Sequence, residues 1–261
     1  MNIFKYTCLL VFLSLMSCVP TKDLIYLQNN GNGESVQAIN PVASKPYRVQ
    51  TNDIINIAIK GIDPILMAMF NPNEASGANL TETNLYFNAY TVDDHGNIRM
   101  PLLGTISVMG LTLEETRIKI EDQLLTNFFN KEANIYVNVK LAGFRYTING
   151  EVTQPGSKIL MQEKVNILEA IANSGDITVT GDRKSVAVIR QFPHGTEIHT
   201  LDLTDISAMQ SPYYYLQPND YIYVKPLPQK AWGTGTTGIQ SFTTIISVMT
   251  LVTTTILLFI K

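Results

Sequence analysis

The sequence predicts an α+β protein that ends in a single membrane-spanning helix. Between residues 46 and 226, stretches with the period-two alternation of strands are interleaved with stretches that have the spacing of amphipathic helices. One turn-and-strand pattern occurs twice, once near each end of this region. Residues 239–260 then carry no charged side chain and are mostly apolar. As a helix they would be about 32 Å long, which is enough to cross one hydrocarbon core.

The N-terminus has the pattern of a secretory signal peptide. Lys5 precedes an apolar run that ends at Met16 and is too short to span a membrane as a helix. The sequence LMSC over residues 15–18 resembles the bacterial lipobox, in which the cysteine is lipidated after cleavage. An ordinary signal peptide with a chance cysteine is the alternative. We predict a lipoprotein signal peptide over residues 1–17 and lipidation at Cys18.

Cysteine usage agrees with this interpretation. Cys8 would leave with the signal peptide and Cys18 would carry acyl chains, so the mature protein would contain neither a free thiol nor a disulfide. Val19 follows the cysteine, so nothing resembles an inner-membrane retention signal, and we expect the inner leaflet of the outer membrane. Residues 18–45 are polar and rich in Asn, Gly, Gln and Ser, which predicts an extended, lipidated tether.

A pattern of eleven positions occurs twice in the chain. Residues 47–57 read YRVQTNDIINI, and residues 214–224 read YYLQPNDYIYV. In both copies Asn-Asp predicts a tight turn whose side chains bond to their own backbone. The alternation that follows predicts a half-buried strand. Two unrelated turn-and-strand units are the alternative to an internal repeat.

The region after the first copy predicts a hairpin, a helix and a strand. Residues 93–97 predict a turn, residues 98–101 a short strand, and Gly104 and Gly110 bracket a second strand. Thr112, with a glutamate three places on at Glu115, predicts a capping box. The residues expected on or near one face of the helix that follows are Leu113, Thr116, Ile120, Leu124 and Phe128. Residues 134–141 alternate again and predict a strand.

The next block has the wiring of a β-grasp unit. Residues 146–152 predict a strand, and residues 154–156 (QPG) predict a turn in which Pro fixes one dihedral angle and Gly permits the next. A second strand is expected over residues 157–161, a helix over residues 166–173, and a further strand over residues 185–190. The order is therefore hairpin, helix and strand.

These residues resemble a known family. GEVTQPG (150–156), LEAIANSGD (168–176) and VAVIR (186–190) resemble the soluble-ligand-binding β-grasp (SLBB) module. YRVQTNDIINIAI (47–59) and VDDHGNIRMPLLGTISVMGLT (92–112) resemble the polysaccharide export domain that precedes it in outer-membrane lipoproteins of capsule and exopolysaccharide translocons. Only one SLBB module fits before the tail, which is fewer than some relatives carry.

The resemblance divides the chain into parts. We assign residues 46–143 to the polysaccharide export domain and residues 144–226 to the SLBB domain. Residues 227–238 would form a flexible linker, and residues 239–261 a transmembrane helix. Residues 61–88, rich in Asn, Thr and Met, form an insertion without an assignment.

The resemblance also implies how the protein works. It implies a ring-shaped homo-oligomer in the outer membrane, whose C-terminal helices form an α-helical barrel that conducts a capsular polysaccharide or exopolysaccharide. It implies one further partner, an inner-membrane polysaccharide co-polymerase or chain-length regulator, often with a tyrosine-kinase domain, which spans the periplasm to meet the ring. A periplasmic glycan-binding or scaffold lipoprotein without a pore is the alternative.

The C-terminal segment carries a stripe of hydroxyl side chains. On a helical wheel the residues of this stripe recur at steps of three and four and lie along one line. They are Gln240, Thr243, Ser247, Thr250 and Thr254. In a helical barrel we expect these five residues to line the pore. Ser and Thr in membrane helices also bond back to their own carbonyls or join helices, so a packing face is the alternative.

Catalysis, metal binding and nucleic-acid binding have little support in the sequence. The chain has 19 Lys and Arg against 22 Asp and Glu, so it has no basic excess that would neutralise phosphates. The histidines, which we expect in solvated turns or loops, are His95, His194 and His199. Asp93-Asp94 and the pair Asp202 and Asp205 are spaced like turn acids, although paired carboxylates keep a carbohydrate-active enzyme as a second rival. We predict a protein that is not an enzyme and has no metal or cofactor.

Overall fold

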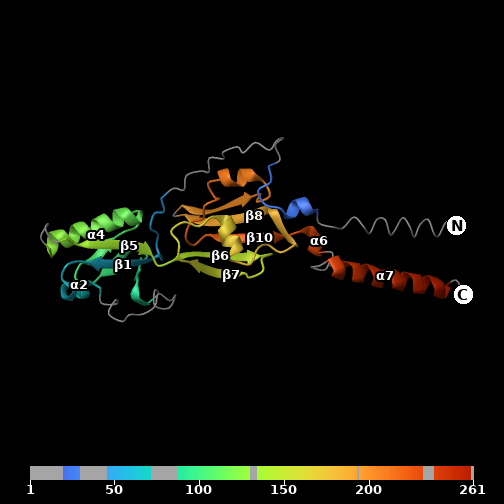
Figure 1. Ribbon diagram of the computed structural model, residues 1–261, viewed down its shortest axis with the longest axis horizontal. Helices are drawn as coiled ribbons and strands as arrows, with labels where there is room; N and C mark the ends of the chain where they lie inside the picture. The colour runs from blue at the N-terminus through green and yellow to red at the C-terminus, as the bar shows by residue number, and fades with distance from the viewer. Residues whose placement is uncertain are drawn as a thin grey trace. The chain divides into compact units, whose positions relative to one another are not determined.

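The computed structural model describes residues 20–29, 46–71, 87–129, 134–192, 194–231 and 238–259 (Figure 1). The chain divides into two compact units. The described residues of the first unit fall in the ranges 43–145 and 159–165, and the other described residues belong to the second unit. We expected a division between residues 143 and 144. The units divide between Arg145 and Tyr146, and a short segment further along also clusters with the first unit.

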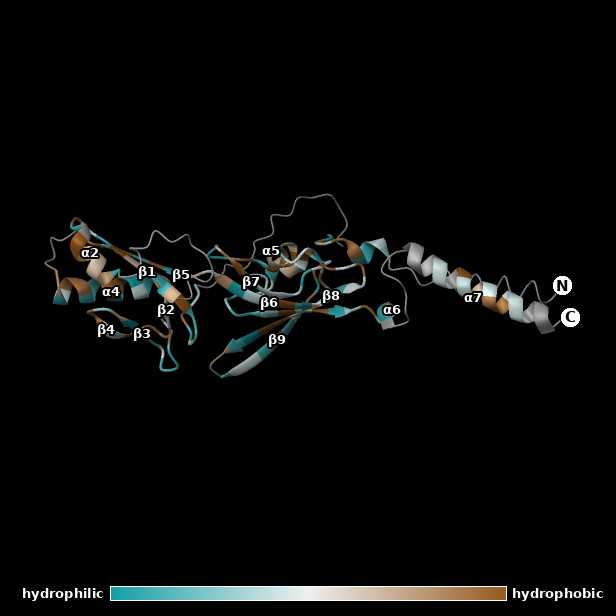
Figure 2. Ribbon diagram, turned by 90° about the horizontal axis from the view of Figure 1, so that it is seen from below, coloured by the Kyte–Doolittle hydropathy of each residue, from teal (hydrophilic) through white to brown (hydrophobic). Residues whose placement is uncertain are grey.

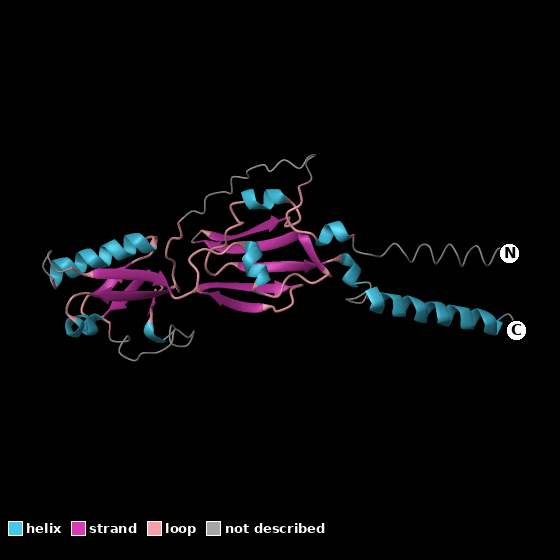
Figure 3. Cartoon of the chain, viewed as in Figure 1, coloured by secondary structure: helices cyan, strands magenta, loops and turns pink. Residues whose placement is uncertain are grey.

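The first unit is built on a three-stranded antiparallel sheet, a β-hairpin and two helices. Its elements are β1 (Ile54–Lys60), α2 (Pro64–Phe70), β2 (Tyr90–Thr91), β3 (Asn97–Met100), β4 (Gly104–Ser107), α4 (Leu113–Asn127) and β5 (Tyr136–Leu141). The sheet has the order β2-β1-β5, and β3 pairs with β4. Figure 3 shows α4 running along β5. The strands and the helix predicted from the sequence for this region are therefore all present.

The core of the first unit lies on one side of β1. Ile55, Ile57 and Ile59 expose 6% of their surface or less, while the residues between them are half-buried. Ile120 and Leu124 of α4 are fully buried in the same cluster. Period-two burial on a strand and period-four burial on a helix are the patterns that the sequence predicted.

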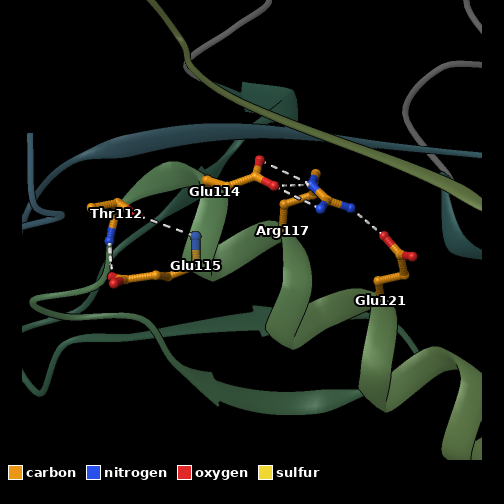
Figure 4. Close-up of polar contacts among 5 residues, drawn as sticks. All are labelled: Thr112, Glu114, Glu115, Arg117 and Glu121. Atoms are coloured by element: carbon orange, nitrogen blue, oxygen red, sulfur yellow. Dashed lines mark hydrogen bonds and ion pairs between the residues drawn. The ribbon is translucent and has the colours of Figure 1, made fainter. Parts of the chain in front are cut away.

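The N-terminus of α4 has the predicted capping box, which Figure 4 shows. The Glu115 N–H donates to Thr112 Oγ1 at 3.2 Å, and the Thr112 N–H donates to Glu115 Oε2 at 2.7 Å. One turn further on, Arg117 donates to Glu114 at 2.7 to 3.0 Å and to Glu121. Two otherwise unsatisfied backbone donors of the first turn are thereby bonded, which fixes where the helix begins.

Part of the unassigned insertion over residues 61–88 is helical. Asp63 accepts hydrogen bonds from the Ile65 and Leu66 N–H groups at 2.9 and 3.2 Å and so caps α2. Asn71, at the other end of α2, is buried, and its side chain bonds both the N–H and the carbonyl of Ile59. The helix is thereby fastened to β1. Residues 72–86 lie outside the described residues.

The second unit contains a five-stranded mixed sheet, except for the first two residues of β6 and the last two of β7, which cluster with the first unit. Its elements are η2 (Thr21–Leu24), β6 (Phe144–Gly150), β7 (Gly156–Leu160), α5 (Ile167–Ala172), β8 (Gly181–Phe192), β9 (Gly195–Leu201), η4 (Ile206–Gln210), β10 (Tyr221–Pro226), α6 (Pro228–Ala231) and α7 (Gly238–Phe259). The sheet has the order β7-β6-β10-β8-β9, with β10 parallel to β6 and antiparallel to β8. A hairpin, a helix, a second hairpin and a last strand inserted between the hairpins match the predicted β-grasp wiring. The sequence did not predict β9.

One face of this sheet is packed against α5. Ile148, Val188 and Ile222 stand side by side on β6, β8 and β10 and are fully buried. The Tyr146 hydroxyl donates to the carbonyl of Ala170 in α5 at 2.8 Å. Gly150 ends β6 with φ of +94°, and a Cβ there would lie 2.0 Å from the Val224 carbonyl oxygen. Only glycine fits at this position, because both the backbone conformation and the close approach exclude a side chain.

Candidate functional site

The C-terminal helix is the first candidate. The segment predicted as a helix over residues 239–261 forms α7, whose 22 residues extend about 33 Å. Figure 2 shows hydrophobic residues mixed with weakly hydrophilic ones along it. The described side chains of α7 are those of residues 243, 244 and 246–255. Among them Val248 and Leu251 expose 63% and 69% of their surface. Within the described residues, no helix is both long enough and apolar enough to cross a membrane.

Five hydroxyl groups among the described side chains of α7 bond to the helix itself. Each donates to the carbonyl four residues earlier, at 2.7 to 2.8 Å. The donors are Ser247, Thr250, Thr253, Thr254 and Thr255. Two of them, Thr253 and Thr255, lie off the predicted stripe, so this bonding does not distinguish the stripe from the rest of the helix. A pore-lining role for the stripe stays a prediction, and the side chain of Gln240 lies outside the described residues.

The two copies of the repeated pattern fold alike. In the first, the Asp53 carboxylate accepts the Gln50 N–H at 2.8 Å, and Asn52 has φ of +68°. In the second, Asp220 accepts the Gln217 N–H at 2.7 Å, and the asparagine between them has φ of +69°. A left-handed Asn and an Asp that bonds backward explain why Asn-Asp is required in both places. The predicted turns are confirmed, and each leads into a strand of the predicted alternation, β1 or β10.

The aspartates of the two turns have different partners. Asp53 accepts a hydrogen bond from the Tyr47 hydroxyl at 2.6 Å. Asp220 accepts two from Arg190 on β8, from Nε at 2.8 Å and from Nη2 at 2.7 Å, and Arg190 also donates to the Tyr215 carbonyl at 3.2 Å. Burial raises the pKa of Asp220 above its ordinary value, and the Arg190 guanidinium opposes that rise. This ion pair could not be predicted from local sequence patterns, because the two residues are thirty positions apart.

Residues 20–29 bind to the second unit, whereas the sequence predicted an extended tether over residues 18–45. Three backbone hydrogen bonds attach this segment, which we call the leader, to the chain around η4. They join Leu27 N–H to Leu203 O (3.0 Å), Gln28 N–H to Thr204 O (2.7 Å) and Ile206 N–H to Gln28 O (3.2 Å). The expectation was wrong for these residues, because polar composition does not exclude backbone pairing with another segment.

Side chains of the leader make specific contacts as well. The Tyr26 hydroxyl donates to Asp176, and the Tyr26 ring lies 5.3 Å from the guanidinium carbon of Arg183. Burial, together with the bond to Asp176, raises the pKa of Tyr26 well above its ordinary value. Lys184 at the start of β8 pairs with Asp23 at 2.7 Å. Arg183 itself is 6% exposed and donates to the carbonyls of residues 177 and 178, so the ring covers a buried cation.

The start of the predicted linker, residues 227–238, is also attached to the second unit. The Leu227 N–H donates to the Thr180 carbonyl at 2.8 Å, and Lys230 of α6 pairs with Glu151. Glu151 also accepts the hydroxyls of Thr178 and Thr180 at 3.1 and 2.7 Å. Burial acts to raise the pKa of Glu151, but hydrogen bonds from Lys230 and the two threonines hold it below its ordinary value. Residues 227–231 are therefore attached to the second unit, whereas we expected all of residues 227–238 to form a flexible linker. Residues 232–237 lie outside the described residues.

The candidate acids and histidines lie in turns and strands, where several of them hydrogen-bond to the backbone or stack on another ring. Asp93 accepts the N–H groups of residues 95 and 97 at 2.9 and 2.8 Å, as a hairpin-turn acid does. Asp202 accepts the Thr204 N–H at 2.9 Å. His199 lies in β9, where we expected a loop, and its ring stacks on Tyr213 at 4.4 Å. Among the described residues, no group of three or more His, Cys, Asp or Glu could hold a metal ion. Cys18 lies outside them.

Comparisons with known proteins identify both units. Residues 41–140 match the polysaccharide biosynthesis/export protein family, and residues 145–224 match the SLBB domain. The chain therefore belongs to the polysaccharide biosynthesis/export family. This confirms the resemblance found in the sequence.

Two curated relatives carry the same name, EPS I polysaccharide export outer membrane protein EpsA. The one from Ralstonia nicotianae is 26% identical over 58% of this chain and 41% of its own length. The one from Ralstonia solanacearum is 26% identical over 56% of this chain and 39% of its own length. The chain thus spans about two fifths of the length of the curated relatives it matches.

Proposed function

We propose that this protein is an outer-membrane subunit that exports a capsular polysaccharide or exopolysaccharide through an oligomeric channel. The observation that carries the proposal is the succession of a polysaccharide export domain, an SLBB domain and the helix α7 in one chain. The EpsA relatives are named as outer membrane proteins of polysaccharide export, and these names support the location and the cargo that we propose. The sequence also predicts a signal peptide and lipidation of Cys18, which would direct the protein to that membrane.

The proposal includes the uncharged segment that contains α7 as the membrane-crossing element of each subunit; this part rests on the full sequence, since no helix among the described residues meets the requirement by itself. Between Lys230 and Lys261 the full sequence contains no charged residue, and α7 accounts for 22 of those positions. A helix of this length matches a hydrocarbon core of about 30 Å. The hydroxyls that the structure describes donate within the helix, which removes the cost of bringing unsatisfied donors into lipid.

The same bonding suits a lumen. A hydroxyl that donates to its own helix still has lone pairs that accept hydrogen bonds. A wall of Ser247, Thr250 and Thr254 would therefore offer acceptors without charges to the hydroxyls of a passing sugar chain. Such a wall would form hydrogen bonds with the sugar chain without binding it tightly. In a ring of subunits the apolar side of each α7 would face lipid and the stripe would face water.

The remaining parts of the proposal concern partners. The subunits would associate with one another as a ring. The energy and timing of export would come from an inner-membrane co-polymerase or chain-length regulator, often with a tyrosine-kinase domain. These partners are the ones implied by the resemblance to the polysaccharide export family.

Two measurements test the proposal. In a strain that lacks this protein, surface polysaccharide should disappear and return when the protein is restored. Negative-stain images of the detergent-extracted protein should show rings with a central channel. Extraction as a monomer, with normal surface polysaccharide in the deletion strain, would reject the channel and leave the scaffold lipoprotein as the better account.

A further inference from the structure

The last two residues of β6 are an Asn-Gly pair, Asn149 and Gly150. In such a pair the side-chain amide of the asparagine can react with the backbone nitrogen of the next residue, because glycine has no side chain to hinder the approach. The other Asn-Gly pairs of the chain begin at Asn30 and Asn32, which lie outside the described residues. The pair on β6 is therefore the one whose geometry can be examined.

Two hydrogen bonds hold the Asn149 side chain in place. Its Oδ1 accepts the Gly150 N–H at 2.8 Å, and its Nδ2 donates to the Tyr221 hydroxyl oxygen on β10 at 3.0 Å. The residue is exposed, so water reaches the side-chain amide. This amide is thus held against the nitrogen that would attack it, and the loss of freedom that the reaction requires has largely occurred already.

The Gly150 nitrogen does not contribute to the pairing of β6 with β10. The Thr147 N–H donates to the Asp220 carbonyl just before β10 at 3.0 Å. The Glu151 N–H donates to the Val224 carbonyl on β10, also at 3.0 Å. Because successive N–H groups of a strand point to opposite sides, the Gly150 N–H points away from β10. Its reaction with the asparagine side chain would therefore break no bond between the two strands.

We propose that Asn149 is a site of self-modification, at which the folded protein converts this asparagine to isoaspartate and aspartate. The Gly150 nitrogen bonds to Cγ of Asn149, and the bond from Cγ to Nδ2 breaks. Nδ2 leaves as ammonia, with the proton that the Gly150 nitrogen gives up, and a cyclic imide remains. Water then opens the imide at either carbonyl. Opening at Cγ gives aspartate, and opening at the backbone carbonyl gives isoaspartate, in which the chain runs through the former side chain.

Isoaspartate would disturb the contact between β6 and β10, because it lengthens the backbone by a methylene group. There is no space for the extra atoms beside Gly150, where a Cβ would lie 2.0 Å from the Val224 carbonyl oxygen. The following N–H, that of Glu151, donates to the same carbonyl, and the Glu151 side chain holds Lys230 of α6. The modification should therefore loosen the end of β6 and, with it, the attachment of α6.

Incubation of the full-length, detergent-solubilised protein at mildly alkaline pH tests the proposal. Trypsin releases residues 146–158 as one peptide, in which Asn149 is the asparagine. Mass spectrometry should show this peptide gaining the mass difference between an amide and a carboxyl group, and chromatography should separate its two products. The comparison is the same protein unfolded in guanidinium chloride. An intact peptide from the folded protein, at a time when the unfolded protein is converted, would overturn the proposal.

Two variants test whether the structure positions the reacting groups. Asn149→Gln keeps an amide but would have to close a larger ring, and we expect no conversion. Tyr221→Phe keeps the aromatic ring and removes the hydroxyl that holds Nδ2, and we expect conversion to slow several-fold. Thermal unfolding of the fresh proteins confirms that both variants fold. Conversion of Tyr221→Phe at the rate of the unsubstituted protein would contradict the positioning role of Tyr221.

The consequence for α6 has a separate measurement, which does not depend on polysaccharide export. Brief trypsin treatment cuts after Lys230 more readily when the bond to Glu151 is lost. We expect the converted protein to be cut there several-fold faster than the fresh protein. Asn149→Asp, which carries the new charge on an unlengthened backbone, should be cut at nearly the fresh rate. Equal rates for the converted and the fresh protein would contradict the link between the modification and α6.

Discussion

Arg190 and Asp220 form a two-point ion pair whose side chains are 7% and 0% exposed. The pair links β8 to the turn that precedes β10, the central strand of the second unit. The equivalent aspartate in the first copy of the repeat, Asp53, has the neutral Tyr47 hydroxyl as its partner. The two turns share a backbone conformation but differ in the side chain that hydrogen-bonds to the buried carboxylate.

This difference predicts unequal costs for two matched substitutions. Asp220→Asn leaves the buried Arg190 without a counter-charge, and we expect a loss of about 3–5 kcal/mol in the free energy of unfolding. Asp53→Asn replaces a carboxylate that accepts hydrogen bonds from the Tyr47 hydroxyl and the Gln50 N–H, and we expect about 1–2 kcal/mol. Urea denaturation of the detergent-solubilised protein measures both. Equal losses would show that the Arg190 charge is solvated by other means.

The capping box of α4 predicts a smaller and local effect. Thr112→Ala removes the acceptor of the Glu115 N–H, and we expect it to lower the free energy of unfolding by about 1 kcal/mol. Thr112→Ser keeps the hydroxyl and is the control. Urea denaturation is again the measurement, and a Thr112→Ala protein as stable as the serine variant would contradict the role of the cap.

Glu151 predicts a dependence of stability on pH. Its pKa in the folded protein is held below the ordinary value, so its stabilising contribution is complete above the unfolded pKa of about 4.3. It is lost as the pH falls through the lower, folded pKa. Glu151→Gln cannot titrate, so its stability should fall less steeply than that of the unsubstituted protein as the pH is lowered below 4.3. Denaturation curves recorded across this range check the slope; parallel slopes would refute it.

The stripe on α7 predicts which positions face water. Cysteines at Ser247 and Thr250 should react with a membrane-impermeant thiol reagent in whole cells, whereas cysteines at Met249 and Val252 should react far more slowly. The reason is that only the stripe would face the lumen of the channel. With Cys18 acylated, the unsubstituted protein is the unreactive control. Similar rates at all four positions would favour a helix whose hydroxyl face is packed against protein.

Local signals in the sequence predicted much of the fold. Asn-Asp predicted both repeat turns, and Thr112 with Glu115 predicted the start of α4, because each pattern acts within four residues. The Gln-Pro-Gly stretch likewise marked the β6–β7 hairpin, where Gly156 has φ of +138°. Two families of contacts that join distant parts of the chain were not predictable in this way.

The contacts of the leader, residues 20–29, and the Arg190 ion pair are the ones that could not be predicted from the sequence. Tyr26 and Asp176 are 150 positions apart, and the backbone bonds of the leader depend on no particular side chain. The edge strand β9 was missed for a different reason. Most of its side chains are exposed, so it lacks the alternation of apolar and polar residues that marks a half-buried strand.

The position of β10 has a consequence for the order in which the parts of the chain fold. This strand lies between β6 and β8, so the five-stranded sheet cannot close until residue 226 has been delivered. Residues 227–261 come after this strand, and most of them belong to α7. The sheet of the second unit can thus be complete before α7 has been synthesised, which shortens the time during which an exposed apolar helix is attached to an unfinished domain.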